Sequence, residues 1–178
     1  MQNGLLNAML DHGTRRYVKA TAIQHVTVPI VQCMFDNFVK LMNHIGPESR
    51  ESAILIEYLP YAKYCSVSND AMAYNNRGAW LNCTITPNWA NNLAFDAYAK
   101  EWVYDLIAQL EEVEKKDETV SKEDEVVGKR GYFNGSMGDE KSQLVFKLNY
   151  PRLQQLKKKY DPDMVFRKWY PITPALEN

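Results

Sequence analysis

Two expected strands carry side chains that could bind and orient a small organic molecule. Alternation along residues 15–23 (RRYVKATAI) and 78–86 (GAWLNCTIT) separates an apolar face from a polar and aromatic one. The polar and aromatic face carries Tyr17, Lys19, Thr21, Trp80, Asn82, Thr84 and Thr86. The apolar face carries Val18, Ala20, Ala22, Leu81, Cys83 and Ile85. The first face is typical of a ligand floor or an interface, and a solvated face with incidental aromatic residues is the alternative.

The side chains of this face suggest a definite chemistry. Lys19 and Asn82 can donate hydrogen bonds to a developing oxyanion, and Glu57 is the strand carboxylate available for proton transfer. A floor that also holds a flexible ligand in a reactive conformation could catalyse a cyclisation, cycloaddition or isomerisation without a cofactor. Structural roles compete with each assignment, because Lys19 could extend to solvent and Glu57 could pair with a cation.

Other catalytic and binding motifs are absent from the sequence. There is no G-x-G-x-x-G or G-x-x-x-x-G-K-[ST] loop for phosphates and no G-x-S-x-G nucleophile elbow. His12, His25 and His44 lack the spacing of a zinc site, so no metal is expected. Both N-x-[ST] matches lie in or beside expected strands and are interpreted as coincidental.

Composition excludes several classes of protein. The 21 Lys and Arg residues against 22 Asp and Glu give a net charge of -1, unlike a dedicated nucleic-acid binder. With 46% hydrophobic residues the chain can form a core, and no apolar run is long enough for a membrane span. Three cysteines without C-x-x-C spacing and no evident signal peptide predict a reduced, cytoplasmic protein.

Helices and strands alternate along the chain. Apolar residues at helical spacing predict one helix after Thr27 and Pro29 that ends at Gly46-Pro47, and a second over residues 92–113. The expected stripe of the first helix is Val31, Met34, Phe35, Phe38, Met42 and Ile45. That of the second is Phe95, Ala99, Trp102, Leu106, Leu110 and Val113. Residues 52–59 are strand-like.

These elements predict an α+β fold, an antiparallel β-sheet with amphipathic helices on one face. Residues 1–178 are expected to form one domain, with the sheet and both long helices in 14–113 and a charged loop in 114–129. Residues 130–171 then hold a last strand at 130–134, a turn and C-terminal helices, with Asn149 a candidate cap. Two helices cover one face of such a sheet and leave the other open.

The C-terminal residues 149–167 (NYPRLQQLKKKYDPDMVFR) carry a long and specific motif. They resemble the closing signature N-Y-x-R-L-x-x-[LI]-K-x-K-Y-D-P-x-x-x-F of berberine-bridge-enzyme-like FAD-linked oxidases. Shorter stretches resemble the same family in the same order, namely RRYVK at 15–19, AYNNRG at 73–78, Trp89 with the helix after it, and GYFN at 131–134. The resemblance covers about Arg15 to Pro171 and implies the substrate domain of vanillyl-alcohol-oxidase-type flavoenzymes, without the FAD-binding domain.

This resemblance implies that a flavin ring would lie against the open sheet face, with Asn149 near FAD if a partner domain supplies the cofactor. Two positions depart from the family pattern. Asn75-Asn76 stands where many relatives have Pro-His, and Gly135 stands where many have a tyrosine near the substrate. Both changes remove groups that a flavin-dependent oxidation could use.

Three functions remain open at this point. The departures, and a Met1 start inside the substrate domain, favour a cofactor-free enzyme that cyclises or isomerises a hydrophobic natural-product intermediate. The alternatives are a C-terminal fragment of an FAD-linked oxidoreductase and a non-catalytic ligand-binding dimer. The candidate catalytic residues are Lys19, Glu57, Asn82 and Tyr132, and the candidate substrate-binding residues are Tyr17, Thr21, Trp80, Thr84 and Asn134. An uncovered sheet face also predicts a homodimer through that face, with no nucleic-acid or membrane partner.

Overall fold

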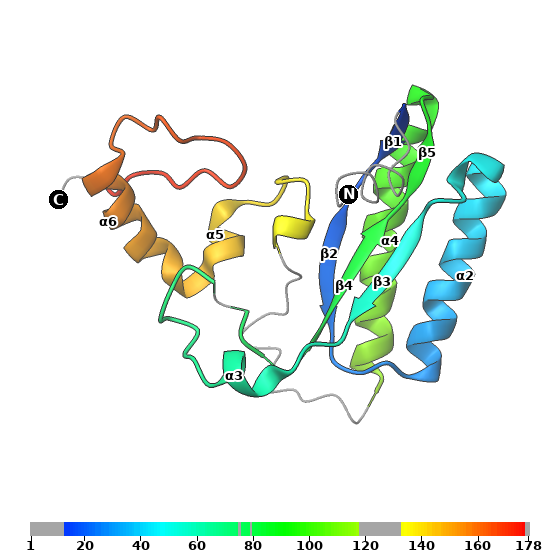
Figure 1. Ribbon diagram of the computed structural model, residues 1–178, viewed down its shortest axis with the longest axis horizontal. Helices are drawn as coiled ribbons and strands as arrows, with labels where there is room; N and C mark the ends of the chain where they lie inside the picture. The colour runs from blue at the N-terminus through cyan, green and yellow to red at the C-terminus, as the bar shows by residue number, and fades with distance from the viewer. Residues whose placement is uncertain (1–12, 75, 79, 118–132, 177–178) are drawn as a thin grey trace, which may run out of the picture. The chain divides into compact units, whose positions relative to one another are not determined.

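The computed structural model describes residues 13–74, 76–78, 80–117 and 133–176, and these form two compact units. Of the described residues, the first unit contains 13–19, 26–55 and 84–117, and the second contains 20–25, 56–74, 76–78, 80–83 and 133–176. The mixture of helices with antiparallel strands confirms the predicted α+β class (Figure 1).

The first unit is built on a strand pair and two long helices. Strand β1 (Thr14–Arg16) pairs antiparallel with β5 (Asn88–Ala90), and Arg15 lies opposite Trp89. Helix α2 (Val28–Ile45) and helix α4 (Asp96–Lys115) pack side by side, as Figure 1 shows. A short 3-10 turn, η1 (Pro47–Ser49), follows α2, and another, η2 (Leu93–Phe95), leads into α4.

A three-stranded sheet has the order β2-β4-β3, with β2 at Lys19–Ile23, β4 at Leu81–Thr86 and β3 at Ala53–Glu57. The predicted strand at 15–23 is therefore two strands, separated at Tyr17-Val18. Strand β4 alternates as expected, since Leu81, Cys83 and Ile85 are buried and the residues between them are half-buried. Strand β2 is different, because all five of its residues are buried. The sheet face that was expected to be open to solvent is therefore buried at β2.

The helical stripes are partly as predicted. In α4, Ala99, Trp102, Leu106 and Leu110 are buried as expected, while Phe95 and Val113 are only half-buried. In α2 the prediction was wrong in part, since the buried residues are Ile30, Met34, Asn37, Leu41 and Ile45. Val31 and Phe35 are exposed. The packed face of α2 is therefore shifted by about one residue from the predicted stripe, and its centre is a buried amide, Asn37.

Asn37 ties α2 to α4 through a closed set of hydrogen bonds. Its Nδ2 donates to Gln109 Oε1 at 3.0 Å and to the Cys33 carbonyl at 2.9 Å. Gln109 Nε2 donates back to Asn37 Oδ1 at 3.3 Å, and Trp102 Nε1 donates to the Asn37 carbonyl at 2.9 Å. A polar side chain in the middle of an apolar interface is stable only when its donors and acceptors form hydrogen bonds, as they do here. The sequence gives no signal for the pair, because its members are 72 residues apart.

Substitution Asn37→Ala is expected to lower the free energy of unfolding by about 1–3 kcal/mol, because it leaves the part-buried Gln109 amide without this partner. Chemical denaturation followed by circular dichroism measures the change. The double variant Asn37→Leu/Gln109→Leu, which removes both amides, should recover part of the loss. If the single variant is as stable as the unaltered chain, the amide pair does not stabilise the helix interface.

The second unit carries short helices and its own apolar cluster. Val145, Phe146, Tyr150 and Tyr170 form the buried centre of this cluster. Burial, helped by Glu140, raises the pKa of Tyr170, whose hydroxyl donates to that carboxylate at 2.7 Å. The helices are α3 (Tyr61–Cys65), η4 (Phe133–Gly135), α5 (Ser142–Phe146), η5 (Lys147–Asn149) and α6 (Tyr150–Tyr160).

The predicted strand at 130–134 is wrong over its described part, since Phe133–Gly135 is a 3-10 turn. A turn of this kind satisfies its backbone locally and needs no partner strand. Residues 130–132, and 118–129 of the expected charged loop, lie outside the described residues. In the described parts of the chain no helix is both long and apolar enough to cross a membrane.

Candidate functional site

Glu57 and Asn82 form a hydrogen-bonded pair on neighbouring strands. Asn82 Nδ2 donates to Glu57 Oε2 at 2.5 Å, from β4 to β3. Adjacent strands bring cross-strand side chains on one face to within about 5 Å, which explains why residues 25 positions apart meet. Glu57 is exposed and Asn82 half-buried, so the carboxylate is held in one orientation while it remains accessible. The structure therefore brings together the predicted base and one predicted donor.

Thr84 and Thr86 follow Asn82 at alternating positions of β4 and are half-buried like it. Alternation places these hydroxyls on the same side of the strand as the Asn82 amide. In the second unit, the accessible part of the predicted polar face is the hydrogen-bonded pair of Asn82 and Glu57. We refer to these two residues as the β3–β4 polar face.

Tyr17 and Lys19 do not belong to an open face, contrary to the prediction. Lys19 is only 5% exposed, and its Nζ donates to the hydroxyl of Tyr104 on α4 at 3.3 Å. The same ammonium lies 5.0 Å from the centre of the Tyr104 ring, and the hydroxyls of Tyr17 and Tyr104 are 3.4 Å apart. Strand β2 is an edge of the sheet, and the long Lys19 side chain packs its stem there while its ammonium meets polar groups of α4. Thr21 is buried as well.

Trp80 was expected on the ligand floor, but it packs against its own loop. The residue precedes β4 and is 5% exposed, and its Nε1 donates to the Asn76 carbonyl at 3.4 Å. Its ring lies so close to Gly78 that a Cβ added there would fall 2.2 Å from it. Asn134 is exposed in η4, and Tyr132 lies outside the described residues.

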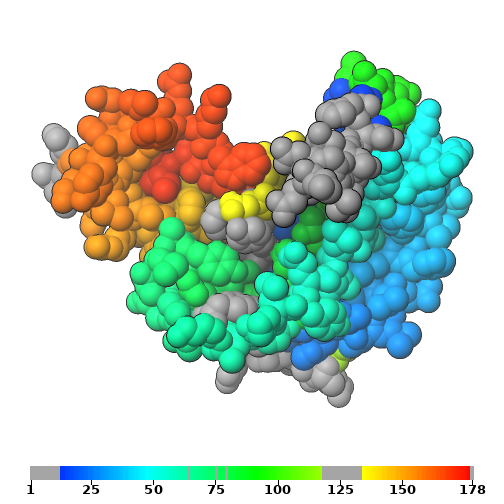
Figure 2. Space-filling model, in the orientation of Figure 1, coloured from blue at the N-terminus to red at the C-terminus, as the bar shows by residue number. Residues whose placement is uncertain are grey.

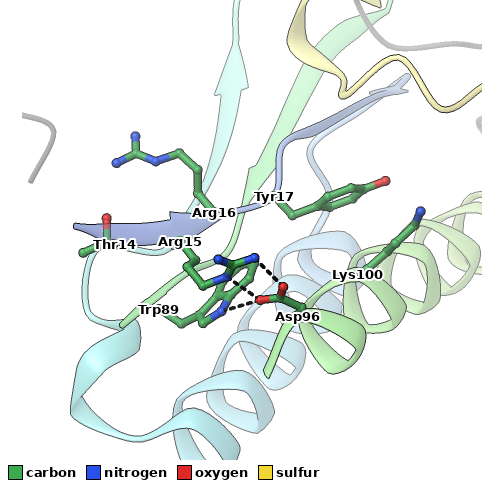
Figure 3. Close-up of a pocket in the computed structure, with 7 residues that line it drawn as sticks. All are labelled: Thr14, Arg15, Arg16, Tyr17, Trp89, Asp96 and Lys100. Carbon is green, nitrogen blue, oxygen red and sulfur yellow. Dashed lines mark hydrogen bonds and ion pairs between the residues drawn. The ribbon is translucent and has the colours of Figure 1, made fainter. Parts of the chain in front are cut away.

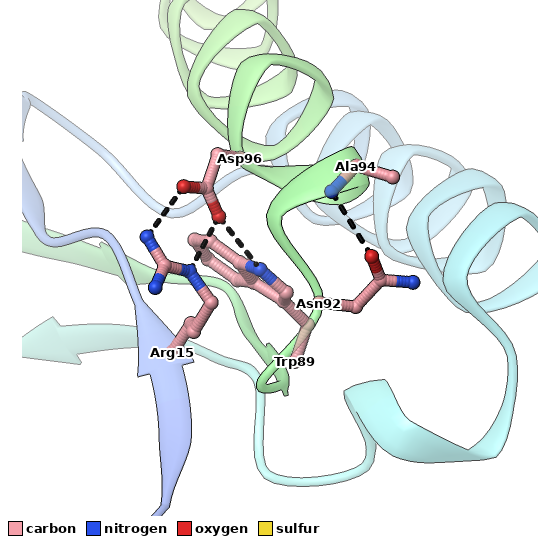
Figure 4. A network of polar contacts seen from close by, with 5 residues as sticks. All are labelled: Arg15, Trp89, Asn92, Ala94 and Asp96. Carbon is pink, nitrogen blue, oxygen red and sulfur yellow. Dashed lines mark hydrogen bonds and ion pairs between the residues drawn. The ribbon is translucent and has the colours of Figure 1, made fainter.

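A polar network that the sequence did not reveal joins β1, β5 and the start of α4. Arg15 Nε and Nη2 donate to the two carboxylate oxygens of Asp96 at 2.6 and 2.5 Å, and Trp89 Nε1 donates to Asp96 Oδ1 at 3.2 Å (Figure 4). The hydrogen bonds from Arg15 hold the pKa of Asp96 below its usual range. In the same figure Asn92 Oδ1 accepts from the Ala94 amide at 3.0 Å and caps η2. Arg15 and Asp96 are 81 residues apart, so only folding pairs them.

An open pocket of about 380 Å³ lies beside this network, and Arg15, Trp89 and Asp96 form part of its lining. Figure 3 shows Arg15, Trp89 and Asp96 bonded together on one side of strand β1, while the Arg16 guanidinium points away from them. The pocket is lined by Thr14, Arg15, Arg16, Tyr17, Trp89, Asp96 and Lys100. Since both oxygens of Asp96 already accept hydrogen bonds, this carboxylate stabilises the fold and is not placed for proton transfer. In the described residues no group of His, Cys, Asp and Glu side chains could hold a metal ion.

Comparison with known proteins finds sequences that are similar to this chain. Residues 131–172 match the family model described as "Berberine and berberine like". An FAD-linked oxidoreductase of Aspergillus terreus, pgmH, is 34% identical over 175 residues, which cover 92% of this chain and 34% of the relative. The chain thus contains a berberine-like segment and is homologous to FAD-linked oxidoreductases. It spans about a third of the length of the curated relatives that it matches.

Solved structures of berberine-bridge-enzyme-like flavoenzymes share the fold of this chain. A berberine-bridge-enzyme-like protein from Arabidopsis thaliana superposes with a TM-score of 0.63 at 16% identity, over 97% of this chain and 36% of the other. The glycopeptide hexose oxidase DBV29, solved with teicoplanin, has a TM-score of 0.64 at 22% identity, over 91% of this chain and 33% of the other. The predicted resemblance and the fold class are both confirmed.

Asn149 is the first residue of the berberine-like C-terminal motif, and its side chain forms hydrogen bonds within the fold. It is buried, and its Nδ2 donates to the Asn69 carbonyl at 2.7 Å and to the Ala73 carbonyl at 3.5 Å. Asn69 Oδ1 in turn accepts the Arg77 amide at 2.8 Å. The expected N-cap hydrogen bond to α6 is not formed, because the amide reaches across to the loop at 69–77 instead. This motif asparagine thus anchors the loop that carries the second family stretch, AYNNRG.

Asp161, in the later part of the same motif, binds the backbone of the loop that follows α6. Its Oδ1 accepts the Val165 amide at 2.8 Å, and its Oδ2 accepts the Phe166 amide at 3.1 Å. Lys157 forms an ion pair with Asp161 and donates to the Phe166 carbonyl at 2.6 Å. The hydrogen bond from Lys157, with those from the two amides, lowers the pKa of Asp161. We call this arrangement the Asp161 clamp.

The Asp161 clamp predicts a pH dependence of stability. A carboxyl group whose pKa is lower in the folded chain than its usual 3.8 stabilises the fold above that value, and the stabilisation is lost as the pH falls through the folded pKa. Thermal unfolding of Asp161→Asn, measured from pH 7 to pH 2, should show a lower Tm than the unaltered chain at pH 7 and a smaller difference at pH 2. A Tm difference that stays constant down to pH 2 would contradict the assignment.

FAD is the cofactor named for the curated relatives, and the described residues fit only part of it. The β3–β4 polar face offers an amide and an oriented carboxylate, which can hydrogen-bond to the edge of a polar ring or to a substrate hydroxyl. A pyrophosphate needs a glycine-rich loop or a helix N-terminus with free amides, and the described residues contain no glycine-rich loop. Asn82 and Glu57 are thus the described groups that could meet a polar edge of such a cofactor.

Proposed function

We propose that this chain is the substrate-side part of an FAD-linked oxidoreductase and acts together with a flavin-binding part. The observation that carries the proposal is the 34% identity over nearly the whole chain to an FAD-linked oxidoreductase of which it covers one third. The accessible β3–β4 polar face supports it, because its groups suit the reacting end of a flavin and its substrate.

FAD, when bound by the partner, would supply the two-electron acceptor for oxidation of a substrate alcohol. Such an oxidation would also release the proton of the substrate hydroxyl, so a base is required beside that hydroxyl. Glu57 would accept this proton, and Asn82 would hold the carboxylate in position through its 2.5 Å hydrogen bond. The substrate class is a small hydroxylated organic molecule.

The cofactor-free cyclase favoured by the sequence alone is less well supported. Its proposed floor needs Lys19, Thr21 and Trp80, and all three are buried in the fold. The curated relatives described above are FAD-linked, which favours the flavin-dependent alternative. A homodimer through the open sheet face, a cytoplasmic location and the lack of a nucleic-acid partner stay predictions.

The proposal is tested by supplying the flavin-binding part separately. The A. terreus relative, expressed without the third that matches this chain and loaded with FAD, is mixed with the purified chain. We expect the two polypeptides to co-elute in gel filtration with flavin absorbance, and the bound flavin to be reduced by vanillyl alcohol or cellobiose under anaerobic conditions only when both are present. If the purified chain without FAD converts these alcohols, or if the two polypeptides never co-elute, the proposal is wrong.

A further inference from the structure

Two pairs of side chains that join the β1 region to α4 line the open pocket of the first unit. In one pair Arg15 donates to Asp96, and in the other the Lys100 ammonium lies 5.6 Å from the centre of the Tyr17 ring. Asp96 and Lys100 are four residues apart on α4, so they share one face of the helix. Figure 3 shows these side chains between the strand and the helix, and all four line the pocket.

The pocket has the size and the access of a small-molecule site. Its volume of about 380 Å³ lies within the range of about 300–1,000 Å³ that such sites have. In Figure 2, blue atoms of β1 lie beside green atoms of the segment around β5 at the surface of the first unit. Because the pocket is open, a ligand can enter it from solvent without a rearrangement of the backbone.

The Arg15 guanidinium can bind a second acceptor besides Asp96. Its Nε and Nη2 donate to the Asp96 carboxylate, whereas its Nη1 forms no hydrogen bond with the described residues. The side chain is 34% exposed, so a ligand in the pocket can reach it. A guanidinium has five N–H donors and binds carboxylates through two parallel hydrogen bonds. Arg15 can therefore hold Asp96 with one edge and an anionic ligand with another.

The charges that line the pocket favour an anion. Arg15, Arg16 and Lys100 against Asp96 leave an excess of two positive charges in a chain of net charge -1. Arg16 points away from Arg15, so the cation that shares the pocket with Arg15 is Lys100 (Figure 3). An ammonium has three N–H donors, and its contact with Tyr17 is to the face of the ring. An anion between Arg15 and Lys100 would thus meet two cations.

We propose that this pocket binds a small aromatic carboxylate, whose oxygens accept hydrogen bonds from Arg15 and Lys100. The rings of Tyr17 and Trp89 also line the pocket, which gives the aromatic part of such a ligand an apolar surface beside the donors. An inorganic anion would leave this surface unused. The inference goes beyond the proposed function and does not rest on it, because no residue of the β3–β4 polar face lines the pocket.

The test titrates trans-cinnamate into the ¹⁵N-labelled chain and follows the indole N–H signals of the tryptophans by NMR. Trp89 Nε1 donates to Asp96 beside Arg15, so its signal should shift along a saturable curve. Trp102 Nε1 donates to the Asn37 carbonyl between α2 and α4, so its signal should stay in place. Cinnamamide has nearly the same shape without the charge, and its Kd should be higher by about tenfold or more.

Variants of Lys100 make the assignment specific. Lys100→Gln leaves the Arg15–Asp96 ion pair intact and should raise the Kd of cinnamate by about tenfold, because it removes a charge-assisted hydrogen bond. Lys100→Arg keeps the charge and should stay within about threefold of the unaltered chain. The matched control, Lys40→Gln, removes an exposed cation of α2 that does not line the pocket and should leave the Kd unchanged. The Trp102 signal shows whether each variant is folded.

Four results would overturn the inference. The Trp89 signal does not respond to cinnamate, cinnamamide binds as tightly as cinnamate, or Lys100→Gln binds cinnamate as tightly as the unaltered chain. The fourth is that inorganic phosphate displaces cinnamate and binds more tightly, which would make the pocket a site for simple inorganic anions. The titration uses the chain alone, without FAD or the flavin-binding part, so each of these results leaves the proposed function standing.

Discussion

Replacing Glu57 by glutamine is expected to lower kcat of the reconstituted two-part enzyme by about 10²–10⁴-fold, the usual contribution of a positioned base. Glutamine keeps the size of the side chain and can still accept the hydrogen bond from Asn82 through its carbonyl, but it cannot take a proton. Substrate binding should therefore change little, so the loss appears in kcat and not in KM. Stopped-flow reduction of the bound flavin by vanillyl alcohol or cellobiose measures it.

A matched control is Glu101→Gln, an exposed carboxylate on α4 of the first unit, which should leave kcat unchanged. Asn82→Leu provides a second comparison, since it leaves the carboxylate but removes the donor that orients it. It should lower kcat less than Glu57→Gln and change its pH dependence. Equal rates for Glu57→Gln and the unaltered chain would exclude Glu57 as the base, while the association of the two parts could still hold.

Substitution Gly78→Ala is expected to destabilise the chain by about 3 kcal/mol, at the upper end of what overpacking costs. A Cβ at this position would lie 2.2–2.4 Å from three ring atoms of Trp80, well inside van der Waals contact. Trp80 is buried and its indole nitrogen is bonded to the Asn76 carbonyl, so moving the ring would break this bond and disturb its packing. The glycine of the family stretch AYNNRG is thus required by close packing. Urea unfolding followed by tryptophan fluorescence measures the effect.

A double-mutant cycle makes this prediction specific. Trp80→Leu alone should also destabilise, because it removes a buried aromatic ring. If the clash is the cause, adding Gly78→Ala to Trp80→Leu should cost much less than about 3 kcal/mol, which gives a large coupling energy. Additive losses in the two variants would show that the glycine is needed for another reason.

The sequence by itself predicted the resemblance to berberine-bridge-enzyme-like proteins, the fold class and the local pattern of the elements. The motif at 149–167 is long enough to show this resemblance without structural information, and both long helices follow from apolar spacing. Alternation along β4 correctly separated Leu81, Cys83 and Ile85 from Asn82 and Thr84, because the side-chain period of a strand is a local property. The position of Asn82 on the accessible side of β4 followed from the same rule.

Only the tertiary structure decided which polar side chains remain accessible. Alternation assigns a residue to one side of its strand, but it cannot say whether a helix covers that side, and Tyr104 of α4 covers Lys19 at the edge strand β2. Likewise Asn149 reaches the carbonyl of Asn69, and Arg15 pairs with Asp96. Each of these contacts joins atoms that come together only when the chain packs, and packing depends on the volume and shape of distant residues rather than on local periodicity.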